Sequence, residues 1–260
     1  MEGSPYVWGV AAGAALTVAG CGLAASQVQP ALAEDLDFTP HPTESQFLSR
    51  AGYGARPGDA AALARQGREA WIEEQLQAAA PEPLHLTLLL SGLDALRIEG
   101  WELGDMPEDA LIRQLQSAAI YRATHSPNQL RERLAEFFSD HFNIHAKKAS
   151  GVYLLVGDQE SVIRKHLLGR FEDMLLASAQ SPAMLNYLDN KVNRLQGVNE
   201  NYAREILELH TLGVHGGYSQ RDVRALARVL SGWTIETRAF HPRGRFRFDP
   251  DTHDVSAKVV

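Results

Sequence analysis

Apolar side chains recur every three or four residues through most of the chain after residue 43, and this spacing is typical of helices that bury one face. The periodicity predicts helices over Thr43–Arg50, Asp59–Ala78, Asp109–His125, Asn128–His145, Asp158–Ala179, Pro182–Asn190, Asn199–Leu212 and Ser219–Leu230. From Trp233 to Phe248 the pattern changes to β-branched and aromatic residues around a proline-glycine turn, which predicts a hairpin. We therefore expect an all-α protein, a multi-helix orthogonal bundle with a small β-hairpin near the C-terminus.

Local signals mark several boundaries between these helices. Ser219 is followed three residues later by Asp222, which is a capping box and predicts a helix start. The glycine-rich segment from Gly52 to Gly58 and the prolines at positions 81 and 83 interrupt the helical pattern. No internal repeat is present, so residues 34–260 are predicted to form one helical domain.

The first part of the chain has a different character. No charged residue occurs between Pro5 and Ala33, and the segment is rich in alanine, glycine, valine and leucine. Residues 1–33 are therefore predicted to be an export leader, either a signal peptide or a lipoprotein signal, with a short buried helix as the alternative. The Val-Ala-Gly-Cys sequence ending at Cys21 resembles a lipobox, which would place a lipid on Cys21. The Ala-Leu-Ala sequence ending at Ala33 resembles a signal-peptidase site.

An export leader determines where the protein is expected. We expect it to be exported: periplasmic, anchored in the outer envelope, or extracellular. Contact with a membrane is expected only through the leader or the lipid anchor. The first residues, Met1-Glu2-Gly3-Ser4, depart from the usual pattern, because signal peptides begin with lysine or arginine.

Composition and charge narrow the classes of protein. The chain has 260 residues, 45% of them hydrophobic and 22% charged, with a formal net charge of −7, which excludes collagen-like and multi-span membrane proteins. Residues 194–247 are rich in arginine but contain no lysine-rich run or aromatic-basic motif, so no nucleic-acid partner is expected. The single cysteine excludes an internal disulfide and a multi-cysteine zinc site.

Several segments are similar to one bacterial family, domain of unknown function 1800 (DUF1800). The matching segments are Ser49–Gly54, Phe137–Phe142, Pro182–Asn190, Asn199–Gly213, Gly232–Thr234 and Phe248–Pro250. Family members are generally exported and longer, so the resemblance implies that this chain is the N-terminal part of the pattern and lacks a C-terminal portion. It implies no established activity. Because members are often encoded beside exported sulfatase-like proteins, it implies such a partner as readily as an enzymatic role.

The helix predicted over Asn199–Leu212 has two contrasting faces. At 100° per residue, Asn201, Arg204, Glu205 and Glu208 share a polar face, and His210 lies on the opposite, apolar face. Two carboxylates beside a guanidinium and an amide suit catalysis or ligand binding, so Glu205, Glu208 and Arg204 are candidate catalytic residues and Asn201 a candidate ligand-binding residue. A divalent metal would be the cofactor of such a site. The alternative is a solvated face with an i,i+4 pair between Arg204 and Glu208.

A second hypothesis concerns histidine. On the predicted helix Asn128–His145, His141 and His145 are four residues apart and point inward with Leu134 and Phe137, while Glu132 points outward. This spacing can hold a metal, so His141 is a candidate metal ligand, although the glutamate of the H-E-x-x-H motif is missing. The alternative is a hydrogen-bonded histidine in the core. The oxygen-rich segment 249–254 is interpreted as a polar turn, since it lacks the order of a calcium loop.

Several enzyme classes are excluded by missing motifs. The chain contains no G-x-S-x-G elbow, no phosphate-binding G-x-x-x-x-G-K-[ST] loop and no Glu-x-x-His pair on the candidate helix faces. Two hypotheses remain open. The first is an exported enzyme of the hydrolase type, or a metal- or ligand-binding protein, that uses the polar helix face. The second is a non-catalytic envelope scaffold or partner module for exported sulfatase-like proteins.

Overall fold

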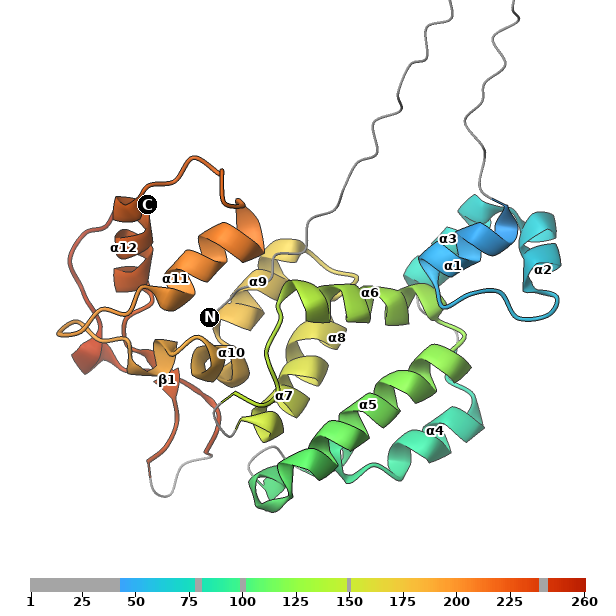
Figure 1. Ribbon diagram of the computed structural model, residues 1–260, viewed down its shortest axis with the longest axis horizontal. Coiled ribbons are helices and arrows are strands. Elements are labelled where there is room, and N and C mark those ends of the chain that lie inside the picture. Colours follow the sequence, from blue (N-terminus) through green and yellow to red (C-terminus); the bar gives the residue numbers. More distant parts are fainter. Residues whose placement is uncertain (1–42, 78–80, 99–101, 149–150, 239–242) are drawn as a thin grey trace, which may run out of the picture. The chain divides into compact units, whose positions relative to one another are not determined.

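Helices make up most of the computed structural model, which describes residues 43–77, 81–98, 102–148, 151–238 and 243–260 (Figure 1). The predicted leader and Cys21 lie outside the described residues. The α-helices of the first half are α1 (Glu44–Ala51), α2 (Asp59–Gln66), α3 (Arg68–Gln77), α4 (Leu84–Ser91), α5 (Glu108–His125) and α6 (Gln129–His141). Two short 3₁₀ turns, η1 (Asp94–Leu96) and η2 (Glu102–Asp105), connect α4 to α5.

The second half contains shorter helices, two of which are wound in part as π-helix. The helical elements are α7 (Val152–Asp158), η3 (Gln159–Ile163, π), α8 (Arg164–His166), α9 (Phe171–Ala179), α10 (Pro182–Tyr187), η4 (Asn190–Val192, 3₁₀), α11 (Asn201–Glu205), η5 (Ile206–Thr211, π) and α12 (Gln220–Val229). The elements α7, η3 and α8 follow one another without a gap, and so do α11 and η5. Single π-turns inside α-helices are frequent at functional sites, so both segments are candidate positions for such a site.

A two-stranded antiparallel hairpin follows α12. Strand β1 (Trp233–Ile235) pairs with β2 (Phe246–Phe248), and Trp233 lies opposite Phe248. A 3₁₀ turn, η6 (Pro250–Thr252), leads into the last residues. The prediction of an all-α multi-helix bundle with a small β-hairpin near the C-terminus is therefore confirmed.

Most predicted helices are present, but several boundaries were wrong. The predicted helix Asp59–Ala78 is broken at Gly67, whose φ of 87° lies in the left-handed region that favours glycine. Helix α4 was not predicted, because its run of leucines has no clear helical period. The helix predicted to begin at Asp158 begins six residues earlier, at Val152, so Asp158 lies inside a helical segment instead of capping one.

The cores explain how these elements are held together. The larger one is formed by side chains of α6 to α12 and the hairpin, including Phe142, Ile163, Met184, Tyr202 and Val223, none more than 2% exposed. A smaller cluster joins α7 to α5 and the 3₁₀ turns. The segment α7–η3–α8 contributes to both, so its position is fixed from two sides. In the described part of the chain, no helix is both long enough and apolar enough to cross a membrane.

Candidate functional site

A cleft of about 420 Å³ lies beside the segment where α7 passes into the π-turn η3. Its walls come from α7, η3, the start of α10 and the chain leading into β2. The residues with polar groups that line it are Tyr153, Asp158, Ser161, Ser181, Arg243 and Arg245. We call it the Asp158 cleft. Its volume is in the range of small-molecule sites in proteins.

Asp158 and Ser181 form the buried floor of this cleft. Asp158 is only 4% exposed and Ser181 only 3%. The Ser181 hydroxyl, which precedes the first residue of α10, donates a hydrogen bond of 2.5 Å to Oδ1 of Asp158. Burial raises the pKa of the Asp158 carboxyl to about 6, and the hydrogen bond from Ser181 opposes that rise. A carboxyl whose pKa is close to neutral can both accept and donate a proton at working pH.

Two more hydroxyl groups are buried in the same region. Tyr202 of α11 and Ser178 of α9 are each 1% exposed, and neither hydroxyl has a hydrogen-bond partner in the described part of the protein. Burial, above all, raises the pKa of Tyr202, the neighbouring Ser178 hydroxyl opposes that rise, and the negative charge of Asp158 adds to it. Buried polar groups without partners are uncommon and mark places where a fold accepts a cost. Here the hydroxyl of Tyr202 lies close enough to Asp158 for the charge of that carboxyl to act on it.

Arginine side chains supply the exposed part of the Asp158 cleft. Arg243 and Arg245 are exposed, and both precede β2. Gly244 lies between them with φ of 74°, and a Cβ there would stand 3.3 Å from Cδ2 of Leu154 on α7. The backbone N–H of Gly244 donates to the carbonyl of Glu236, which fixes this arm beside β1. The close approach of Gly244 to α7 thus places the arginines at the mouth of the cleft.

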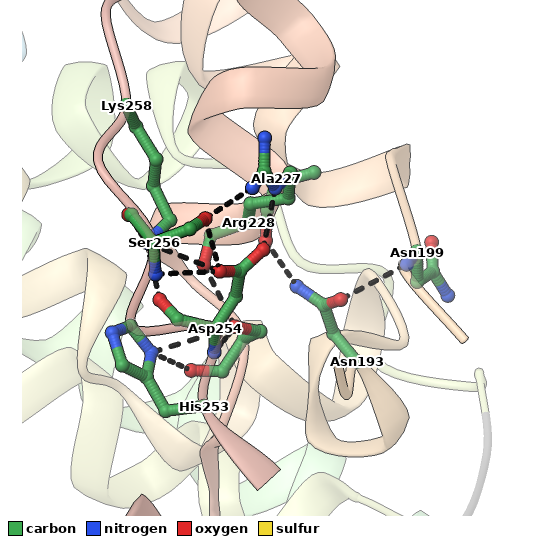
Figure 2. Close-up of polar contacts among 9 residues, drawn as sticks. Asn193, Asn199, Ala227, Arg228, His253, Asp254, Ser256 and Lys258 are labelled. Atoms are coloured by element: carbon green, nitrogen blue, oxygen red, sulfur yellow. Dashed lines mark hydrogen bonds and ion pairs between the residues drawn. The ribbon is translucent and has the colours of Figure 1, made fainter. Parts of the chain in front are cut away.

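The chain after β2 is anchored by a buried polar cluster, the Asp254 cluster (Figure 2). The carboxylate of Asp254 accepts hydrogen bonds from Arg228 of α12 and from Ser256, and Lys258 also bonds to the backbone carbonyl of Asp254. The hydrogen bond from Arg228 is the main cause that holds the pKa of Asp254 well below its usual range, and the bond from Ser256 adds to it. Segment 249–254 is a polar turn, as interpreted from the sequence, and its last carboxylate binds arginine. The cluster therefore fastens the end of the hairpin to α12.

Asparagine side chains fix the other end of the hairpin. The amide of Asn190 donates to the backbone carbonyls of Leu230 and Trp233 at 3.2 and 3.1 Å. Asn193 donates to the carbonyl of Ala227 and accepts from the backbone N–H of Asn199, as Figure 2 shows. Because α12 and β1 are bonded to the same loop, the first strand of the hairpin is held in place.

The predicted polar face of residues 201–208 does not line the Asp158 cleft. Arg204 pairs with Glu200 at 3.3 Å and with Gln220, so the expected pair with Glu208 is not formed. The amide of Asn201 donates to the carbonyl of Leu188 at 3.1 Å and holds the loop before α11. Glu205 and Glu208 are partly exposed. Burial, followed by the neighbouring charge of Glu208, raises the pKa of Glu205, while Arg204 opposes the rise.

The two histidines of the metal hypothesis have different surroundings. Helix α6 ends at His141, so His145 follows the helix and is exposed, and the predicted inward pair at positions 141 and 145 was wrong. His141 donates from Nε2 to the backbone carbonyl of His210 at 3.0 Å, and the two rings are 6.1 Å apart. His210 is 4% exposed, which confirms its predicted inward position, and its Nδ1 has no partner in the described residues.

Metal ligation needs more groups than these two rings supply. Among the described residues, no three histidine, cysteine, aspartate or glutamate side chains come together as a metal site. Instead of a third ligand, aromatic side chains surround the pair, with the ring of Phe142 5.1 Å from His210 and that of Phe171 5.7 Å from His141. This environment suits a core histidine. Burial is the main cause that lowers the pKa of His210, to about 4, and the charge of the nearby His141 adds to the effect.

The prediction that Glu132 faces outward was also wrong. Its side chain is 5% exposed and binds the Arg164 guanidinium in two places, at 2.6 and 2.8 Å. Phe137, predicted to point inward, is 58% exposed. Helix α6 contacts α3, α5 and the π-turn η3, so more than one of its faces is covered and a single apolar stripe does not describe it. A second cleft, of about 430 Å³, lies between α5, α6 and η3 and includes this ion pair.

Sequence reasoning missed Asp158 and Ser181 as functional candidates. A signal existed, because Leu154, Asp158 and Val162 are spaced by four residues and all three are buried. A carboxylate at the middle position of such an apolar row is unusual and predicts a perturbed group. The signal was hidden by the assignment of Asp158 to a helix start, where aspartate is ordinary.

Comparisons with known proteins place the chain in a family context. A family model described as "Protein of unknown function (DUF1800)" matches residues 46–260. No curated protein and no solved structure matches the chain.

Proposed function

This chain belongs to the DUF1800 family, and we propose that it is an exported bacterial protein with a hydrolase-like acid–base site in the Asp158 cleft. The observation that carries this proposal is the hydrogen-bonded pair of Asp158 and Ser181, both buried and both lining a cleft open to solvent. Perturbed carboxyl groups in clefts are characteristic of active sites. Asp158 would transfer a proton, and Ser181 would orient its carboxyl group.

The location proposed for this activity is outside the cytoplasm: the periplasm, the outer envelope or the extracellular space. The support for it is the uncharged leader predicted over residues 1–33 and the resemblance to exported proteins. A lipid on Cys21 would provide the anchor. No metal enters this proposal, because its proton-transfer group belongs to the chain itself.

Chromogenic p-nitrophenyl esters of acetate, phosphate and sulfate test the proposed activity. We expect the wild-type protein to hydrolyse at least one of them and Asp158→Asn to lose about a hundredfold in rate or more, which is the usual contribution of a general acid or base. Asp173→Asn, in the first turn of α9, removes a carboxylate that does not line the cleft and is the matched control. Equal rates for wild type and Asp158→Asn, or no hydrolysis of any ester, would contradict the proposal.

A second candidate function is docking of an exported sulfatase-like partner through the π-turn η5. Its support is that Glu205 and Glu208 are partly exposed beside Leu209 and Leu212, whose exposed fractions are 60% and 55%. Contiguous exposed apolar side chains with a charged rim are typical of interaction surfaces. In this case the catalytic roles considered for Glu205, Glu208 and Arg204 would be replaced by partner contacts.

The docking function is tested by co-purification of the two proteins from the envelope fraction. Leu209→Ser with Leu212→Ser should abolish association with the sulfatase-like protein while leaving ester hydrolysis unchanged. Retained association in this double variant would exclude η5 as the docking surface. The matched control is Leu176→Ser, because Leu176 of α9 is also exposed, at 53%, but lies on another helix.

A further inference from the structure

We propose that the ligand of the Asp158 cleft carries an oxyanion group, such as a phosphate, sulfate or carboxylate, which Arg243 binds at the mouth. This inference rests on the proposed function in using the same cleft, and it specifies the class of ligand. The polar remainder of the ligand would reach the floor, where Asp158 and Ser181 lie.

The charges that line the cleft favour an anion. Asp158 is the only carboxylate among the described lining residues, and it lies at the buried floor. Arg243 and Arg245 lie at the exposed mouth and carry two positive charges. Asp158 makes no ion pair with a described residue, so no described side chain neutralises its charge by pairing with it. Guanidinium groups bind phosphate, sulfate and carboxylate through two parallel hydrogen bonds.

Arg243 is the arginine best suited to a ligand. It makes no hydrogen bond or ion pair with a described residue, whereas most other arginines of the hairpin region are engaged. Arg238 binds Glu236, Arg247 binds Asp249 and Arg228 binds Asp254. The Arg243 guanidinium, next to a glycine held against α7, can bind a ligand without first breaking an internal contact.

The other residues that line the Asp158 cleft could bind the remainder of the ligand. Tyr153 and Phe246 provide aromatic surface, and Ser161 and Ser181 provide hydroxyl groups. The Ser161 hydroxyl already donates to the carbonyl of Gly157, so it would act toward a ligand as an acceptor. This mixture suits a small polar molecule with one anionic end more than an apolar one.

Binding of an anion should depend on the protonation of Asp158. Ser181 from α10 bonds to its carboxyl, Tyr202 from α11 lies close enough to be affected by its charge, and Arg243 and Arg245 from the arm before β2 line the same cleft. The hydroxyl groups are neutral and the arginines stay charged between pH 5 and pH 7.5, so Asp158 is the group whose charge changes. An ionised Asp158 adds a negative charge to the cleft and opposes the binding of an anion, whereas a protonated Asp158 does not. Affinity for an oxyanion is therefore expected to rise as the pH falls.

Sulfate is the probe, because its charge is the same at pH 5 and pH 7.5. Isothermal titration calorimetry of the full-length protein at constant ionic strength should show binding that is several-fold tighter at pH 5. Arg243→Gln should weaken sulfate binding about tenfold, the usual effect of losing a charged hydrogen bond. Arg221→Gln removes an exposed arginine of α12 that does not line the cleft, and it should bind as the wild type does.

The Asp158→Asn variant separates this inference from the proposed function. It should bind sulfate with the same affinity at both pH values, although its hydrolytic rate is lost. If sulfate does not bind the wild type, or binds Arg243→Gln and Arg221→Gln equally, the oxyanion inference is overturned and the hydrolytic proposal stands. If sulfate binds as expected and Asp158→Asn hydrolyses esters at the wild-type rate, the oxyanion inference stands and the hydrolytic proposal fails.

Discussion

Asp158 and Asp254 are both buried carboxyl groups, yet their surroundings act on them in opposite directions. Asp254 receives hydrogen bonds from Arg228 and Ser256, which favour its charged form. Asp158 receives one neutral hydrogen bond, from Ser181, and burial in that position favours its protonated form. A residue that makes the fold less stable at neutral pH is typical of a functional position.

The substitution Asp158→Asn should therefore stabilise the protein at pH 7.5. In the wild type, folding raises the pKa of the Asp158 carboxyl from 3.8 to about 6. The stability that the protonated carboxyl contributes is therefore fully present below pH 3.8 and is lost as the pH rises through 6. We expect a gain of about 1 to 3 kcal/mol in the free energy of unfolding at pH 7.5, measured by urea denaturation. The gain should vanish at pH 3.5.

Asp254→Asn is the matched control for this measurement. It should lower stability at pH 7.5, because the Arg228 guanidinium then loses its buried anionic partner. A loss of stability in both variants would show that Asp158 is an ordinary structural carboxylate.

His210 gives a second pH-dependent prediction, of opposite sign. Its pKa is about 4 in the folded protein and about 6.5 when unfolded, so its contribution to stability is complete above pH 6.5 and is lost as the pH falls toward 4. The loss should reach about 2 to 3 kcal/mol over this range. His210→Gln should remove that part of the slope in urea denaturation. His145→Gln, at an exposed position, should leave the slope unchanged.

Individual residues were predicted unevenly from the sequence. The inward position of His210 followed from its place beside Ala203, Ile206 and Leu207, all of which are buried. The buried position of Glu132 could not be predicted in this way, because its burial depends on Arg164, which lies 32 residues away in the sequence. Partners so distant in the sequence leave no periodic signal, and a charged side chain without a visible partner is expected to be exposed.

Among the elements, the hairpin determines the position of the mouth of the Asp158 cleft. Gly232, the residue before β1, determines where the hairpin begins. Gly232 has φ of 77°, and a Cβ at this position would stand 2.5 Å from the backbone oxygen of Asp249. Gly232→Ala should therefore cost about 2 kcal/mol or more, because a backbone atom and not a flexible side chain is in the way. Chemical denaturation measures the loss.

The control for this substitution is Gly104→Ala, since a Cβ there meets no atom within 4 Å. Its stability should change by less than about 0.5 kcal/mol. If Gly232→Ala were as stable as Gly104→Ala, the hairpin would have to move away from the position described for it. Sulfate affinity should fall in Gly232→Ala together with stability, because the arm that carries Arg243 follows β1.

The helices show which features the periodicity of apolar residues can predict and which it cannot. Helix α12 begins after Ser219, whose hydroxyl accepts from the backbone N–H of Asp222, so its predicted capping box is confirmed. The π-turns η3 and η5 were not predicted, because a wheel at 100° per residue assumes α-helical winding throughout. An extra residue within one turn is accommodated by tertiary packing, and no residue type marks it.

At the scale of the whole molecule, the sequence predicted the fold class correctly but did not predict the Asp158 cleft. The alternation of apolar and polar residues determines that helices pack on helices, and this is visible in the sequence. The Asp158 cleft joins α7, α10 and the arm before β2, which are up to 93 residues apart between Tyr153 and Phe246. Which helices meet at a cleft is a property of packing, so the site could not be read from any single segment.

Export is the prediction that concerns the molecule as a whole. When the chain is expressed with its leader in a bacterial host, we expect it in the envelope or the medium, as judged by fractionation and immunoblotting. Cys21→Ser should release it from the membrane fraction if the lipobox-like sequence is used. Cytoplasmic retention of the chain with its leader would contradict the predicted export leader.

The Asp254 cluster has a consequence for any shortened form of this protein. Asp254 and Ser256 bind Arg228 of α12, and β2, preceded by the arm that carries Arg243, lies a few residues earlier in the chain. A variant trimmed ahead of Asp254 would keep its helices, Asp158 and the pairing of β1 with β2, yet lose the bonds that fasten the end of the hairpin to α12. Such a protein should fold but bind its ligand more weakly, so the length of the C-terminal tail has to be the same in every binding assay that is compared.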